Sequence, residues 1–420
     1  MTEAGAPRAA RAWPVALVAL VPLWVVASAV SRGHGYLFFA AGALGLALAV
    51  IAFSRGRRDA LYRYVYLLVL ASAFALAFEA VLHLRPSVLR GRLANIAYTG
   101  YHWQRGGIYE LDPHRGPVLR PGVRRPMYWN GHWWHHETGA SGWRGPDVAH
   151  ADAVFLGDSM IYGHGVEEPQ TASARFAART GTIAVNLGQQ GTCQIQSFLT
   201  LSRHAARLRP RLVFASVHPT DVDEGPRLYP ADELRRFADA PEDAAYVPVV
   251  QPDFRPRPQP WWELAAFWTR YIALPLRCAG LAGTLAHWNR PGSQSEEQYA
   301  RDPFVPAPSE LDAVLPALAP DAPPAVSLPW RAERRALREM KRLCDRTGAR
   351  LVVFDLGYPR QFTQAVEALA REIGATYSDA GRQVLARCQA GERVYLADDG
   401  HWSPAGNDAI AERLAPYARQ

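Results

Sequence analysis

A serine that could act as a nucleophile follows an apolar run in the middle of the chain. Ser159 ends the tripeptide Gly157-Asp158-Ser159, directly after residues 153–156. The apolar run predicts a strand, and a helix is expected to follow the serine. In an open parallel sheet, ligands bind beyond the carboxyl ends of the strands. The spacing therefore predicts an exposed Ser159 near a helix N-terminus; an ordinary strand-to-turn junction is the alternative.

A histidine that could activate this serine lies near the C-terminus. His401 follows two acids in the segment Asp398-Asp399-Gly400-His401. A carboxylate can orient the imidazole ring, which can then remove a proton from a serine hydroxyl. The acid three residues before the histidine is Asp398, our first choice, and the acid two residues before it is Asp399. A turn with a solvated histidine is the alternative.

The elements that must position these residues alternate between strand and helix from Ala151 onward. Strands are expected at 153–156, 183–185, 212–217, 350–355 and, as a last short one, 394–396. Helices are expected at 171–179, 195–208, 331–347, 361–373, 379–388 and 404–414. This alternation predicts an α/β fold with a parallel sheet that helices cover on both faces. The domain would span residues 151–420, with an insertion rich in Pro, Trp and Arg at about 223–330 that could shape a substrate groove.

Three apolar stretches begin the chain, at residues 13–30, 36–53 and about 61–84, and each is close to the length that spans a bilayer. We therefore expect three transmembrane helices and a membrane anchor over residues 1–86. A cleaved signal peptide and buried soluble helices are the alternatives. Arginines cluster before the first stretch and between the second and third, which places those segments in the cytoplasm. The chain would then be a multi-pass protein of the cytoplasmic (inner) membrane, with the later domain on the extracytoplasmic, periplasmic side.

Histidines, cysteines and net charge are the remaining signals, and none of them points to a metal, an organic cofactor or nucleic acid. The lead-in at 87–150 contains the histidine-rich segment 129–136, where only Glu137 could complete a ligand set, so a loop or β-hairpin is favoured over a metal site. The cysteines form no CxxC pair, which leaves free thiols or a disulfide open. The net charge is +7, but no basic run is interleaved with aromatics, so a membrane is the expected partner rather than nucleic acid. The four cysteines are Cys193, Cys278, Cys344 and Cys388.

The segments that follow one another from Ala151 onward resemble, in their order, the SGNH (GDSL-type) hydrolase superfamily, and in particular its membrane-anchored bacterial members. The resemblance covers most of residues 151–420 apart from the insertion. It is carried by the Gly-Asp-Ser turn, the late acid and histidine, and a glycine block, Asn186-Leu187-Gly188-Gln189-Gln190-Gly191. Segments 141–146 and 163–166 also resemble membrane-linked members. The resemblance implies a three-layer αβα, flavodoxin-like parallel sheet.

The resemblance also implies a catalytic triad and an oxyanion hole. The late acid and histidine would act on Ser159, and the backbone N–H groups of Ser159 and Gly191 would hold the oxyanion. One block departs from the family, because segment 218–221 places Thr220 where an Asn is usual. The Thr220 hydroxyl could donate with a different reach, or His218 could help instead. Losing one such donor typically costs about 100- to 1000-fold in rate.

The implied function is an extracytoplasmic serine esterase that needs neither metal nor cofactor. Its substrate would be an acyl ester, such as the O-acyl groups of an envelope carbohydrate or lipid, and a partner from envelope polysaccharide biosynthesis would fit. An O-acyltransferase for an exopolysaccharide, using the same acyl-enzyme, is one alternative. A catalytically weak or inactive binding or scaffold protein is the other, and Thr220 is its motivation.

Overall fold

The computed structural model describes residues 108–129, 132–241, 244–255, 314–396 and 399–419, together with positions 66, 81 and 85. The three predicted membrane spans and residues 256–313 of the predicted insertion lie outside the described residues. Among the residues that are described, no helix has the length and apolar character needed to cross a bilayer. The chain divides into two units, residues 1–100 with 259–291 and residues 101–258 with 292–420. All elements below belong to the second unit.

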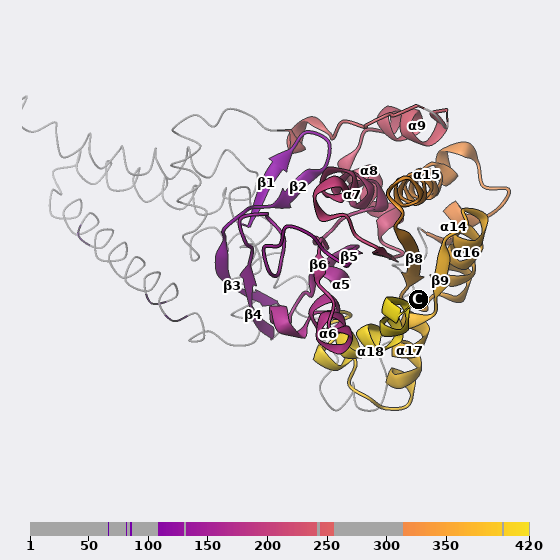
Figure 1. Cartoon of the computed structure of the whole chain (residues 1–420). Helices are drawn as coiled ribbons and strands as arrows, with labels where there is room; N and C mark the ends of the chain where they lie inside the picture. Colours follow the sequence, from indigo (N-terminus) through magenta and orange to yellow (C-terminus); the bar gives the residue numbers. More distant parts are fainter. Residues whose placement is uncertain are drawn as a thin grey trace, which may run out of the picture. The chain divides into compact units, whose positions relative to one another are not determined.

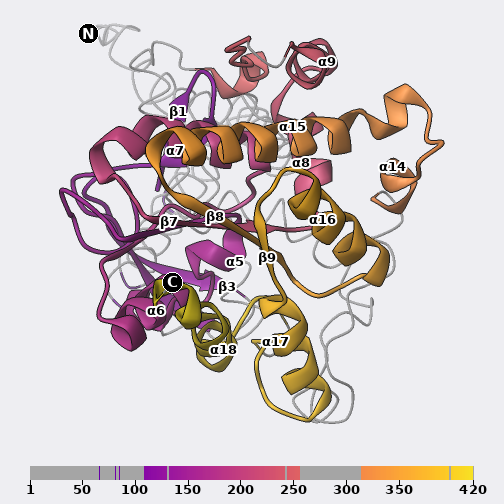
Figure 2. The same cartoon turned by 45° about the vertical axis from the view of Figure 1, so that its right-hand side comes forward.

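A five-stranded parallel sheet forms the centre of this unit (Figures 1 and 2). Its spatial order is β6-β5-β7-β8-β9, which is the 2-1-3-4-5 order of flavodoxin-like folds. This topology confirms the predicted α/β class and parallel sheet. The strands are β5 (Ala153–Leu156), β6 (Ala184–Asn186), β7 (Leu212–Val217), β8 (Arg350–Asp355) and β9 (Thr376–Ser378).

Helices cover both faces of the sheet because alternate residues of each strand point to opposite sides. In β5, Val154 and Leu156 pack in one core cluster with α7, α15 and α16, whereas Ala153 and Phe155 pack in another with α6, α17 and α18. Figure 2 shows α7 and α15 above the sheet, α16 beside it, and α6, α17 and α18 below it. The bounds are α6 (Ala172–Thr180), α7 (Gln194–Leu208), α15 (Pro324–Thr347), α16 (Arg360–Glu372), α17 (Ala380–Gln389) and α18 (Pro404–Leu414).

The prediction of a last strand at 394–396 is wrong. This segment makes only an isolated antiparallel bridge between Tyr395 and Trp402. The fifth strand is β9 at Thr376–Ser378, between two predicted helices, and three residues are too few to show a period of two. The bridge nevertheless matters, because the Leu396 N–H donates to the His401 carbonyl (2.8 Å) and closes the turn that carries this histidine.

The described parts of the predicted insertion pack onto the domain. Helices α8 (Asp221–Leu228) and α9 (Ala231–Asp239) contribute Leu228, Leu234 and Phe237 to a buried cluster with α7 and α15. Helix α15 itself starts at Pro324, earlier than predicted. A 3-10 turn, η5 (Pro252–Phe254), and the short α14 (Leu315–Leu318) border the residues that are not described.

Two antiparallel hairpins precede the sheet, β1 (Tyr109–Asp112) with β2 (Gly116–Leu119) and β3 (Arg124–Trp129) with β4 (His132–Glu137). The histidine-rich segment is thus an arm of a β-hairpin, as the prediction favoured. Strand alternation leaves His135 exposed beside Glu167 and buries His136, whose Nδ1 lies 2.8 Å from the Tyr162 hydroxyl. The hairpin is therefore anchored to the short helix that begins with Ser159.

Candidate active site

The sharp turn after β5 presents Ser159 at the carboxyl end of the sheet. Gly157 has φ +151°, and a Cβ there would lie 2.7 Å from Ile161 Cγ1 and 2.9 Å from Ser216 Cβ, so only glycine fits. Asp158 then caps the short helix α5 (Ser159–Tyr162) by accepting from the Met160 N–H at 3.0 Å. The hydroxyl of the first helical residue is thereby held where ligands bind in parallel sheets.

The structure brings Ser159, His401 and Asp399 together in a continuous hydrogen-bonded chain. His401 Nε2 lies 2.7 Å from Ser159 Oγ, and its Nδ1 is hydrogen-bonded to Asp399 Oδ1. The Asp399 side chain is only 3% exposed, and it also accepts from the His401 backbone N–H at 2.9 Å. Burial by itself raises the pKa of Asp399, but the charge and hydrogen bonds of His401 outweigh it and hold that pKa well below 3.8. Asp398, the first choice from the sequence, lies outside the described residues.

Two residues that the sequence analysis did not single out pack against the hydrogen-bonded Ser159, His401 and Asp399 or against the loop that follows Ser159. The buried ring of His164 stacks on His401, with 4.2 Å between centroids and 24° between planes. Arg144 is fully buried and its guanidinium donates to carbonyl oxygens at both ends of the loop after α5. Both residues fall in segments that resembled family members, but the resemblance gave neither a role. The carbonyl partners of Arg144 are Tyr162 (2.8 Å), Gly163 (2.6 Å), Val166 (2.6 Å) and His135 (3.0 Å).

The glycine block forms a loop bonded directly to the Ser159 turn. The Gln189 N–H and the Thr192 hydroxyl both donate to the Gly157 carbonyl, at 3.1 and 3.2 Å. A Cβ on Gly188 would lie 2.5 Å from the Tyr162 nitrogen, so this glycine permits the close approach of the loop to α5. Gly191 follows in this loop with φ +62°. The loop that carries one predicted oxyanion donor is therefore fixed to the turn that carries the other.

Thr220 is bonded to its neighbour His218. The Thr220 N–H donates to His218 Nδ1 (3.0 Å), and the hydroxyl lies 2.6 Å from the same nitrogen. A ring nitrogen that accepts the N–H carries no proton, so the hydroxyl donates to it as well. His218 Nδ1 lies 3.8 Å from the carboxylate of Asp158, the residue before Ser159. The threonine hydroxyl thus orients His218 beside the Ser159 turn.

Replacing Thr220 with Val is expected to lower kcat for ester hydrolysis by less than about tenfold, because the hydroxyl proton is directed at His218. Steady-state kinetics on p-nitrophenyl acetate measure the effect, and Thr220→Ser, which keeps the hydroxyl, is the matched control. A loss of about 100- to 1000-fold in Thr220→Val that Thr220→Ser restores would instead make the hydroxyl an oxyanion donor.

Four carboxyl groups lie close together behind the Ser159 turn: Asp158, Asp221, Glu224 and Glu333. Gln194 joins two of them, because its side-chain amide donates to Asp221 (2.7 Å) and its backbone N–H donates to Glu333 (2.7 Å). Burial raises the pKa of Asp221 and of Glu333, and raises that of Glu224 to about 9, with the Asp158 charge adding to the effect on Asp221 and Glu224. At neutral pH the cluster therefore holds protons that the unfolded chain would release.

The free energy of unfolding is expected to fall as pH rises from about 5 toward 9, by up to ~1 kcal/mol per pH unit from Glu224. Unfolded glutamate loses its proton near 4.5 and folded Glu224 near about 9, so between these values the folded state binds more protons and loses stability with rising pH. Urea denaturation at pH 5, 7 and 9 measures the slope. Glu224→Gln should make the slope shallower, with the remainder from Asp221 and Glu333, and Glu412→Gln on the surface of α18 is the control. Equal slopes in Glu224→Gln and wild type would contradict this assignment.

One group of described side chains has ligand atoms close enough together to hold a metal ion, namely His164, Asp399 and His401, within 4.8 Å of one another. Both ring nitrogens of His401 are already bonded, to Ser159 and to Asp399. A metal at this place would have to replace those bonds. The arrangement therefore fits proton transfer from Ser159 better than metal ligation. The described cysteines Cys193, Cys344 and Cys388 are buried and form no disulfide with one another, and Cys278 lies outside the described residues.

Neither a protein-family model nor a curated protein matches the chain. Its fold is similar to solved structures of lipases and esterases. TesA is 13% identical, with 63% of this chain and 96% of that chain covered and a TM-score of 0.34. A putative lipolytic protein of the G-D-S-L family from Desulfitobacterium hafniense is 10% identical, with 63% and 97% covered and a TM-score of 0.33. A catalytic mutant of Axe2, an acetylxylan esterase from Geobacillus stearothermophilus, is 10% identical, with 65% and 96% covered and a TM-score of 0.31.

Proposed function

We propose that the protein is a serine hydrolase that cleaves carboxylic esters with Ser159 as its nucleophile. The observation that carries this proposal is His401, which bridges the Ser159 hydroxyl and the buried Asp399 carboxylate. A nucleophile, a base bonded to it and a group that orients the base are the three parts of nucleophilic ester hydrolysis.

In the first step, His401 Nε2 takes the Ser159 proton while Ser159 Oγ bonds to the ester carbonyl carbon. The negative charge of Asp399 stabilises the imidazolium that forms. Backbone N–H groups of Ser159 and Gly191 are proposed to hold the oxyanion, since their loops are bonded together at Gly157.

In the second step, the carbon–oxygen bond to the alcohol breaks and His401 returns its proton to the leaving oxygen. The acyl group then remains on Ser159. Water, deprotonated by the same ring, attacks the carbonyl carbon of this acyl-enzyme. The bond to Ser159 Oγ then breaks, His401 returns the proton to Oγ, and the carboxylic acid is released. These steps use the chain's own residues from start to finish.

The proposed substrate is an O-acyl ester on an envelope carbohydrate or lipid, reached from the extracytoplasmic side of the membrane. The three N-terminal apolar stretches and their flanking arginines support this location. A reporter fused after Gln420 tests it: a periplasm-only reporter is expected to be active, and activity of a cytoplasm-only reporter would refute the orientation.

A single assay separates the three possible activities. The full chain is supplied with p-nitrophenyl acetate, alone and with a free or an acetylated oligosaccharide. Hydrolysis without sugar, together with loss of acetate from the acetylated oligosaccharide, is expected of an esterase. Faster p-nitrophenol release only with free sugar, and acetate found on that sugar, would show a transferase. No turnover would favour a scaffold and overturn the proposal.

A further inference from the structure

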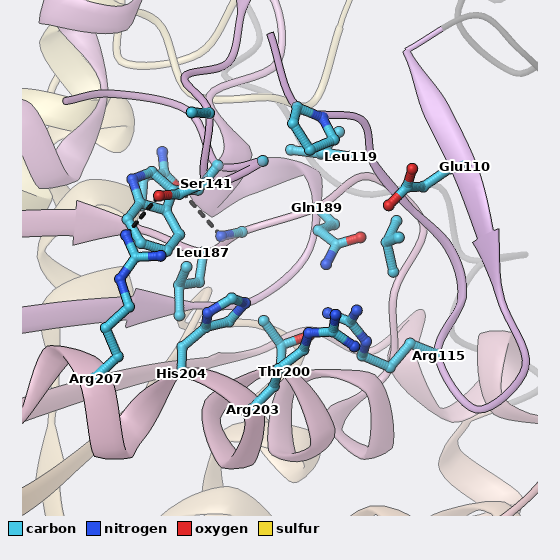
Figure 3. A pocket seen from close by; sticks show the side chains of 17 residues that line it. Glu110, Arg115, Leu119, Ser141, Leu187, Gln189, Thr200, Arg203, His204 and Arg207 are labelled. Atoms are coloured by element: carbon cyan, nitrogen blue, oxygen red, sulfur yellow. Dashed lines mark hydrogen bonds between the residues drawn. The ribbon is translucent and has the colours of Figure 1, made fainter. Parts of the chain in front are cut away.

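A cavity of about 390 Å³ lies behind the glycine block (Figure 3). Its walls come from the β1–β2 hairpin, the loop at 140–143, the start of the glycine block and helix α7. Gly188 lines the cavity and also contacts the backbone of α5, the helix that begins with Ser159. The volume lies within the range of small-ligand pockets, about 300–1000 Å³.

Positive charge dominates the lining, which includes three arginines and a single acid, Glu110. Asp112 forms an ion pair with Arg115 at 3.0 Å and lies 3.7 Å from Arg203, so one carboxylate serves two guanidinium groups. Arg207 donates to neutral oxygens, the Ser141 hydroxyl (2.5 Å) and the Val148 carbonyl (3.1 Å). The charge of Arg207 also acts on the Asp147 carboxylate, whose pKa it lowers, whereas Arg203 shares Asp112 with Arg115. Arg203 is therefore the lining cation whose charge its neighbours balance least.

His204 lies within the cavity, and its pKa is affected by the same arginine charges. Its ring stands between the arginines on α7, as Figure 3 shows. Burial and the three arginine charges lower the pKa of His204 to about 4. The imidazole is therefore neutral at pH 7 and offers one donor and one acceptor.

Neutral hydrogen-bonding side chains complete the lining. Ser141, Thr200 and Gln189 reach the cavity from three different walls. Trp143 also lines it, and the Arg207 guanidinium lies 4.7 Å from the centre of the Trp143 ring. Guanidinium groups bind carboxylates, often through two parallel bonds, while hydroxyl and amide groups match the hydroxyls of a sugar. A ligand that combines a carboxylate with several hydroxyls could therefore bind both the guanidinium groups and the neutral polar side chains.

We infer that this cavity is a binding subsite for an acidic sugar residue, with Arg203 and Arg207 on its carboxylate. The inference rests on the proposed function, since it makes the ester-bearing substrate an acidic polysaccharide. The subsite also adjoins the proposed catalytic residues. The Gln189 side chain lines the cavity, and its backbone N–H donates to the Gly157 carbonyl in the turn before Ser159. A bound sugar here would set which neighbouring ester reaches Ser159.

Titration calorimetry on the full chain carrying Ser159→Ala tests the inference without turnover. Tri-galacturonate is the acidic probe and maltotriose the neutral probe of equal length. Tri-galacturonate is expected to bind at least tenfold more tightly, and Arg203→Gln should weaken it by about tenfold, the usual loss for a hydrogen bond to a charged group. Arg371→Gln changes an exposed arginine on α16, outside the cavity, and should leave binding unchanged. Glu110→Gln removes the lining acid and should strengthen binding several-fold.

Equal binding of the two probes, or an equal loss in Arg203→Gln and Arg371→Gln, would overturn the inference. Inorganic phosphate that competes as well as tri-galacturonate would also overturn it, because the cavity would then bind anions without regard to sugar. These readouts use an inactive protein and unacylated probes. Failure of the subsite is therefore distinguishable from failure of the esterase proposal, which is measured by turnover.

Discussion

Replacing Ser159 with Ala is expected to lower kcat for p-nitrophenyl acetate by about 10⁴- to 10⁶-fold. The substitution removes the hydroxyl that lies 2.7 Å from His401 Nε2, so no acyl-enzyme can form at this position. Some acceleration over water would survive, because the oxyanion donors and binding contacts remain. The melting temperature should stay within a few degrees of wild type, because alanine keeps the backbone bonds of Ser159, whose carbonyl accepts from the Gly163 and His164 N–H groups.

Ser202→Ala is the matched control for this change. Ser202 lies exposed on α7, and its hydroxyl donates to the Phe198 carbonyl at 2.9 Å. Its replacement should leave kcat within twofold of wild type. Turnover in Ser159→Ala within tenfold of wild type would sink the mechanism and point to a different nucleophile.

Replacing Asp399 with Asn should lower kcat by about 10⁴-fold. The Asp399 carboxylate accepts from His401 Nδ1, which keeps the proton-accepting nitrogen at Nε2 toward Ser159. An amide of the same shape can present its NH₂ group instead and hold the ring in the wrong tautomer. The loss should therefore appear in kcat, with KM changed much less.

Asp398→Asn is the internal control, since it removes the same charge one residue away. It is expected to change kcat by less than tenfold, because the Asp399 carboxylate already occupies Nδ1. A larger loss in Asp398→Asn than in Asp399→Asn would assign the orienting role to Asp398. Comparing the two variants thus shows which acid orients His401, whatever the absolute rates are.

The sheet was predictable from sequence where its strands are long enough to show a pattern. Strands β5, β7 and β8 have the predicted bounds, because apolar runs buried on both faces stand out against polar helices. The sequence does not predict the edge strand β9, and it predicts a strand at 394–396 that the structure does not form. Three residues carry too little periodicity, so pairing across the sheet decides which short segment becomes a strand.

The candidate site was predictable only in its motifs. Ser159 and His401 came from local patterns, but the choice of acid depends on how the turn before His401 closes. The bridge between Tyr395 and Trp402 closes that turn. The two spacings in the sequence, three residues to Asp398 and two to Asp399, leave the choice open. Arg144 and the arginine-lined cavity depend on contacts between segments far apart in the chain, so local sequence could not indicate them.

Labelling with a fluorophosphonate is the most direct test of the central claim, which is that His401 and Asp399 activate Ser159. The reagent forms a covalent bond only with an activated nucleophile, and mass spectrometry of the digested protein locates it. We expect one adduct, on Ser159, that disappears in Ser159→Ala and forms at least 100-fold more slowly in His401→Gln. An adduct on another residue, or no adduct in a protein that turns over ester, would contradict the account.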